Sequence, residues 1–153
     1  MIKEIFQLNK KYKNAWLWTD NKPARSLGVG FEASIHEYIL KWYNTKDAST
    51  YPLMKDISLL YVEQYPSDVI ACNDAGLSAM LTDDLRTAKK YFAQGYELDP
   101  ADMLLLRNLA RVCYHLGETE SAYSYYSILA ESEDPDDREY AEQILSTYFN
   151  QDE

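Results

Sequence analysis

Residues in the second half of this chain recur at an interval of 34 positions. Gly76 lies 34 positions before Ala110, and Phe92 lies 34 positions before Tyr126. A fixed interval of about 20 to 50 residues is typical of stacked repeats, in which each unit buries its apolar face against the next. The interval therefore predicts a stack of helical hairpins, an architecture that holds partners more often than it catalyses reactions.

Apolar residues recur at steps of three and four along most of the chain, which predicts helices. The expected helices cover 3–14, 31–45, 52–64, 68–81, 84–98, 102–116, 118–132 and 136–149. Residues 19–30 are expected to form a connection, because Pro23 disfavours helix at the residue before it and two glycines follow. After residue 67 the connections are short, at about two to four positions, and such connections force neighbouring helices to run antiparallel. We therefore expect an all-α fold of about 7–8 helices.

Small, aromatic and proline residues coincide within the repeat. Ala88, Phe92 and Pro100 follow Gly76 in the order and at the spacing of the tetratricopeptide repeat (TPR) pattern, W-x2-L-G-x2-Y, then A-x3-F, then P. The chain resembles this family over two units at about 69–135. The resemblance implies a right-handed superhelical stack of antiparallel helical hairpins, a TPR-like solenoid.

The resemblance divides the chain into four parts. Residues 1–30 lie outside it and are expected to form an N-terminal helix and connecting loop that cap one end. Residues 31–66 are a degenerate repeat or a different helical hairpin, because Met54 and Ser58 stand where the family has alanine and an aromatic residue. Residues 67–135 hold the two TPR units, and 136–153 a C-terminal capping helix and tail.

Charge and cysteine content restrict the class of partner and the compartment. Residues 48–153 carry 7 Lys/Arg against 20 Asp/Glu, and a surface this acidic argues against nucleic acid as a partner. Cys72 and Cys113 fall at apolar helical positions and are expected to be buried free thiols, which fits a reducing compartment. The segment 1–13 is too charged for a secretory signal, and no apolar run is long enough to span a membrane. We expect a cytoplasmic protein without a membrane partner.

Motifs of catalysis and metal binding are missing from the sequence. Its 2 histidines, His36 and His115, lie in no ligand-spaced cluster, and His36 is expected on a helix surface. The pair Asp83–Asp84 is better explained as the start of a helix, where carboxylates meet the positive end of the dipole. The three tryptophans are Trp16, Trp18 and Trp42. We expect them to pack in the core or in an end cap, and the alternative is that they form an exposed aromatic platform. We expect neither an enzyme nor a need for a metal or cofactor.

The resemblance implies that the first helix of each hairpin lines a concave, peptide-binding groove. The candidate groove residues on the first of these helices are Asn73, Asp74, Leu77, Met80 and Leu81. Those on the first helix of the next hairpin are Leu104, Arg107, Asn108, Arg111, Tyr114 and His115. Arg107, Arg111 and His115 are spaced four apart and form one stripe, which could hold a carboxylate through bidentate hydrogen bonds. Equally, the two arginines could pair with acidic residues of neighbouring helices, namely Asp74, Asp102 or Glu118.

These observations favour a protein- or peptide-binding scaffold or adaptor that uses the concave face. Its partner would be another protein or a peptide, acidic or with a free carboxylate. Two alternatives stay open: a homo-oligomer that self-associates through an end of the stack, and a regulatory or chaperone-like subunit of an enzyme or secretion complex.

Overall fold

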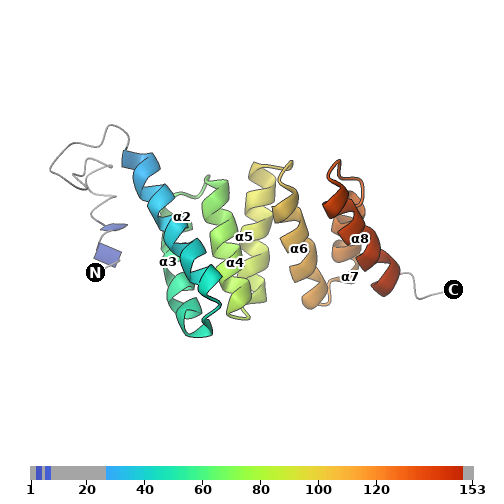
Figure 1. The fold of residues 1–153 in the computed structure, drawn as a ribbon, viewed down its shortest axis with the longest axis horizontal. Helices are drawn as coiled ribbons and strands as arrows, with labels where there is room; N and C mark the ends of the chain where they lie inside the picture. Colours follow the sequence, from blue (N-terminus) through green and yellow to red (C-terminus); the bar gives the residue numbers. More distant parts are fainter. Residues whose placement is uncertain (1–2, 5, 8–26, 150–153) are drawn as a thin grey trace.

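The computed structural model describes residues 3–4, 6–7 and 27–149, and Figure 1 shows their helices arranged in a row. Residues 27–149 form seven α-helices and one short 3-10 helix, without a strand. The α-helices are α2 (Leu27–Thr45), α3 (Tyr51–Gln64), α4 (Val69–Leu81), α5 (Leu85–Leu98), α6 (Met103–His115), α7 (Thr119–Leu129) and α8 (Pro135–Tyr148), and the 3-10 helix is η1 (Ala48–Thr50). The expected all-α class is confirmed.

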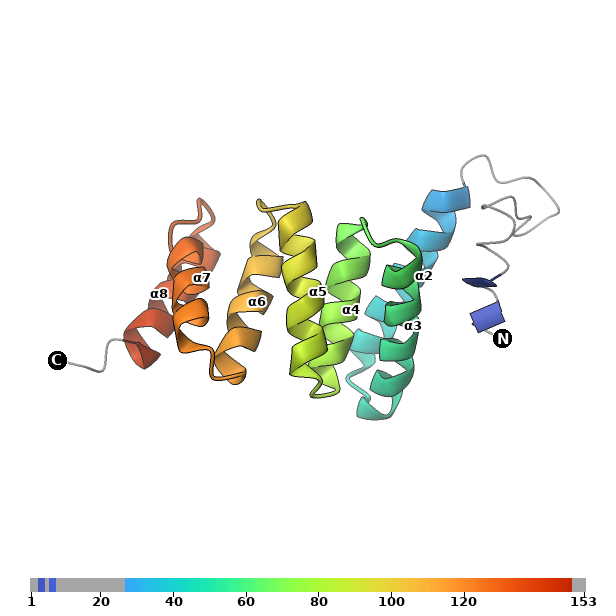
Figure 2. The ribbon, with the colours of Figure 1, turned by 180° about the vertical axis from the view of Figure 1, so that it is seen from behind.

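Each helix packs against the next one in the chain, from α2 to α8. Contacts also join α2 to α4 and α4 to α6, so alternate helices lie on the same side of the row. Figure 1 shows α2 and α8 nearer the viewer than α3 and α7, and Figure 2, seen from behind, shows the reverse order. The molecule therefore has one side built by α2, α4, α6 and α8 and another built by α3, α5 and α7.

The 34-position interval recurs in the helix boundaries. The helices α3, α5 and α7 begin at residues 51, 85 and 119, and α4 and α6 begin at 69 and 103. The ends of α4 and α6 repeat the same interval, at Leu81 and His115. Met54 and Ser58 of α3 are fully buried, as Ala88 and Phe92 are at the same places in α5. The spacing therefore extends to α3, although its buried residues differ.

Left-handed residues mark the turns between the paired helices. Asp83 (φ 59°) and Gly117 (φ 75°) end the turns after α4 and α6, and their separation is again the repeat interval. Lys46 (φ 55°) occupies the same place after α2, but it lies three positions further from Asp83 than the interval requires. The three residues of η1, which follow Lys46, account for this difference. Because of these three residues, α2 does not follow the 34-position spacing, although its turn keeps a left-handed residue.

Buried apolar residues form two clusters. One joins α4, α5, α6, α7 and α8, and its largest fully buried side chain is Phe92. The other joins α2, α3 and α4 and includes Phe6, which is 6% exposed. Cys72 and Cys113 are buried free thiols, as expected, and burial raises the pKa of each to about 11.

Two helix boundaries differ from those expected by more than one residue. α2 begins at Leu27, so Gly28 and Gly30 lie in a helix and not in a connection. A glycine costs a helix about 1 kcal/mol, and packing of Ile35 and Ile39, both buried in α2, outweighs that cost. α7 ends at Leu129, three positions early, because the N–H groups of residues 131 and 132 turn back to bond residues 128 and 129.

Trp42 lies half-buried against the cluster of α2, α3 and α4, with its ring 6.4 Å from that of Tyr38. This is the packing expected for it. Trp16 and Trp18 lie outside the described residues. Of the helices that the structure describes, none combines the length and apolar character needed to cross a membrane.

Candidate functional site: the α4–α6 face

The candidate residues lie on α4 and α6, two helices that contact each other on the same side of the molecule. We call this surface the α4–α6 face. Four of its side chains are half-buried, four are exposed and one is buried. They are, in that order, Asn73, Leu77, Met80 and Arg107; Leu104, Arg111, Tyr114 and His115; and Asn108, which is 7% exposed.

Arg107 does not extend freely from the face. Its guanidinium forms an ion pair with Asp137 of α8 and lies 4.8 Å from the ring centre of Tyr140, also of α8. The expected alternative, in which the arginines pair with Asp74, Asp102 or Glu118, is wrong for this residue. Those carboxylates instead bond His36, the first turn of α6 and Lys89, respectively. The charge of Arg107 is therefore neutralised within the protein.

Arg111 remains available to a ligand. It lies one turn beyond Arg107 on α6, it is exposed, and it forms no ion pair within the described part of the chain. On the same helix lie Leu104 and Tyr114, which are 53% and 39% exposed. The expected stripe of cations is thus reduced to Arg111 and His115, beside apolar surface.

Two buried polar atoms on this face have no hydrogen-bond partner. They are the side-chain oxygen Oδ1 of Asn73 and the guanidinium nitrogen Nε of Arg107. The two residues are one repeat interval apart and occupy equivalent places on α4 and α6. A buried polar atom that lacks a partner is costly and uncommon, so each marks a place where a ligand or a water would be stabilised.

Asp74 is not on the surface where it was expected, because its side chain is fully buried. Its two carboxylate oxygens lie 3.2 and 2.9 Å from Nδ1 of His36 on α2. Burial raises the pKa of the Asp74 carboxyl to about 6, against the opposing effect of His36. The expectation that His36 is a simple surface residue is therefore wrong. The sequence carried one signal of this pair: a carboxylate in the middle of an otherwise apolar and small helix.

Aromatic rings border the face at its α8 end. The ring of Tyr114 lies 5.4 Å from that of Tyr148 and 6.1 Å from that of Phe149. The ring of His115 lies 5.8 Å from Tyr114. Because Tyr148 is 52% exposed, this aromatic surface stays open to solvent. The sequence did not single it out, since α8 was expected only to cap the stack.

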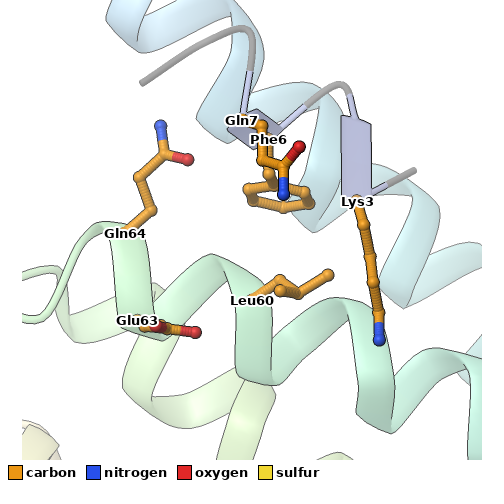
Figure 3. A pocket seen from close by; sticks show the side chains of 6 residues that line it. All are labelled: Lys3, Phe6, Gln7, Leu60, Glu63 and Gln64. Carbon is orange, nitrogen blue, oxygen red and sulfur yellow. The ribbon is translucent and has the colours of Figure 1, made fainter. Parts of the chain in front are cut away.

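A shallow hollow of about 310 Å³ lies away from this face, between residues 3, 6 and 7 and α3. Figure 3 shows Phe6 opposite Leu60, with the long polar side chains of Lys3, Gln7, Glu63 and Gln64 around them. Among these six lining residues, no side chain has a buried polar atom without a partner. The hollow therefore offers less to a ligand than the α4–α6 face does.

Comparison with known proteins gives no assignment. No protein-family model matches the chain, and a search of curated proteins found no match.

Proposed function

We propose that this protein is a protein- or peptide-binding module built as a short TPR-like solenoid, whose ligand lies on the α4–α6 face. The recurrence of helix starts and left-handed turns at the 34-position interval supports the repeat architecture. The buried free thiols support a cytoplasmic setting. A regulatory or chaperone-like subunit of a larger complex would use the same face.

The unpaired atoms of Asn73 and Arg107 carry the proposal. One is an acceptor and the other a donor, and a peptide group offers the complementary N–H and C=O. Arg111 would bind a carboxylate of the same ligand, because charge-assisted hydrogen bonds to arginine are strong and geometrically specific. The exposed apolar Leu104 would contact a neighbouring side chain. The ligand is therefore an extended peptide with a carboxylate.

Selection from a library of random peptides with free C-termini tests this proposal. The best binder would be synthesised with a free and with an amidated C-terminus, and its affinity measured by fluorescence anisotropy. We expect Arg111→Gln to weaken binding of the free form about tenfold or more, the loss of one charge-assisted bond. The matched control is Arg86→Gln, which removes an arginine from α5 on the other side of the molecule.

The proposal requires the control to bind like the wild-type protein. It also requires amidation to weaken wild-type binding more than it weakens binding by Arg111→Gln. A library that yields no binder, or equal effects of the two substitutions, would contradict it.

Self-association is a second candidate function, favoured by the exposed aromatic surface of Tyr114 and Tyr148 near the last helix. Such a surface is a common protein contact. Light scattering over a range of protein concentrations tests this candidate. A mass that doubles with concentration in the wild-type protein but not in Tyr148→Ser would support it, and a constant monomer mass would exclude it.

A further inference from the structure

His36 occupies on α2 the place that Asn73 and Arg107 occupy on α4 and α6. Each of the three lies ten positions before the left-handed residue that ends its turn: Lys46, Asp83 and Gly117. Since α2 contacts α4 and α4 contacts α6, the three side chains belong to one side of the molecule. The polar row of the α4–α6 face therefore continues onto α2.

The imidazole of His36 is held in a defined orientation. Asp74 is fully buried, and its carboxylate accepts hydrogen bonds only, so Nδ1 of His36 must donate the proton at 2.9 Å. The other ring nitrogen, Nε2, forms no hydrogen bond within the described residues, and 28% of the side chain is exposed. Asp74 is thus a positioning residue that leaves Nε2 free to meet a ligand.

We infer that His36, positioned by Asp74, is a pH-dependent contact for an acidic side chain of the peptide bound on the α4–α6 face. This inference rests on the proposed function and adds α2 to the site. Adjacent packed helices lie about 8–10 Å apart, so α2 and α6 are separated by roughly 16–20 Å. An extended peptide covers that distance in about five or six residues. The ligand would therefore carry an acidic residue five or six positions before the carboxylate that binds Arg111.

The electrostatic surroundings of Asp74 set the direction of the pH dependence. Four helices pack against α4, and the charged groups that act on Asp74 are His36 of α2 and Asp68 at the start of α4 itself. From α3, the hydroxyl of Tyr61 donates to Asp68. Three cations of the helices packed on α4 form ion pairs away from Asp74: Lys55 with Asp84, Lys89 with Glu118 and Arg107 with Asp137. Lys90 of α5 lies over the ring of Tyr91, and neither Arg86 nor Arg111 forms an ion pair within the described part of the chain. None of these cations is among the groups that shift the pKa of Asp74.

Lowering the pH through about 6 adds a proton to the His36–Asp74 pair, because the pKa of the buried Asp74 carboxyl is raised to about 6. The pair then gains one positive charge, while a peptide C-terminus remains ionised at this pH. An acidic side chain opposite His36 is attracted more strongly. Affinity for the peptide therefore rises as the pH falls.

The test measures the affinity of the selected peptide at pH 5.5, 6.5 and 7.5. We expect wild-type binding to be about fivefold tighter at pH 5.5 than at pH 7.5, because a partly exposed ion pair changes affinity by about that factor. The double variant His36→Gln/Asp74→Asn replaces both titrating groups by neutral amides and should bind equally at all three values. Because His115 lies on the same face as Arg111, the comparison is also made in a His115→Gln background, in which the pH dependence should persist until His36→Gln/Asp74→Asn is added.

A ligand-side experiment avoids any question of folding. With wild-type protein, replacing the acidic residue five or six positions before the C-terminus by its amide should abolish the pH dependence. Arg111→Gln should weaken binding at every pH and leave the pH dependence intact. If peptides bind through Arg111 but affinity is independent of pH, or if the double variant retains the dependence, the inference is wrong while the proposed function stands. A library without binders overturns both.

Discussion

The ring of Phe92 lies directly over Gly76. A β-carbon at position 76 would stand 2.6 Å from the ring atoms Cδ1 and Cε1, closer than side-chain atoms approach one another. Both residues are buried, and they join α4 to α5, two helices that pack closely within the stack. The two positions recur one repeat interval later as Ala110 and Tyr126, so the interval reflects this contact between small and aromatic residues.

Gly76→Ala should therefore destabilise the protein by about 1–3 kcal/mol, because the added methyl group overpacks a filled core. Urea denaturation measures this loss. In the double variant with Phe92→Leu, the smaller side chain makes room for the methyl group, so the double variant should be more stable than the sum of the single effects predicts. Strict additivity would show that the close approach of residues 76 and 92 is not the cause.

Both of the equivalent turns should favour glycine at their left-handed residue. Gly117 has φ 75°, and a β-carbon at this position would meet no atom within 4 Å, so Gly117→Ala carries only the backbone cost of a left-handed alanine, about 1 kcal/mol. Asp83 holds φ 59° at the same place after α4. Asp83→Gly should be neutral or slightly stabilising. Thermal melting of Gly117→Ala and Asp83→Gly measures both effects. An unchanged melting temperature in Gly117→Ala would contradict the left-handed conformation assigned to residue 117.

Asp74 should make stability fall as the pH rises. Its folded-state pKa of about 6 lies above the ordinary value of 3.8, so between those two values the folded protein binds more protons than the unfolded chain does. At pH 7 the ionised, buried carboxylate then costs about 3 kcal/mol relative to an unshifted carboxyl. Asp74→Asn removes this cost while keeping an acceptor for His36.

The stability of Asp74→Asn relative to wild type should therefore increase from pH 4.5 to pH 7. Parallel urea titrations at several pH values measure the difference. Asp83→Asn, on an exposed turn residue, corrects for the loss of one negative charge. If the difference in stability between Asp74→Asn and the wild type stays constant with pH, the pKa of Asp74 is not raised in the folded protein.

Two ion pairs on the α3–α5–α7 side should have equal strength. Lys55 lies 2.7 Å from Asp84, and Lys89 pairs with Glu118, which places the two pairs one repeat interval apart. All four side chains are partly exposed, so each pair should stabilise the protein by only about 0.2–1 kcal/mol, decreasing with added salt. Double-mutant cycles with Lys→Met and Asp84→Asn or Glu118→Gln measure the coupling. The amide at position 84 retains the cap on α5. A coupling above about 2 kcal/mol would be inconsistent with exposed pairs.

Local features of the sequence were sufficient for the helical class and for most helix positions. Asp68 and Asp102 accept hydrogen bonds from the first turns of α4 and α6, and Asp134 with Pro135 starts α8. Capping and periodicity act over a few residues, so they are visible without the fold. The end of α7 was misplaced because the N–H groups of residues 131 and 132 bond residues 128 and 129, and no glycine or proline marks that turn in the sequence.

The candidate face was predicted less completely. Helical spacing alone dictates which residues share a side of α4 and of α6, so that part could be read from the chain. The neutralisation of Arg107 by Asp137, the burial of Asp74 against His36 and the unpaired state of Arg111 emerged only from the packed fold. Partners of a charged side chain come from helices that are distant along the chain, so they depend on how the helices pack together and not on the spacing within any one helix.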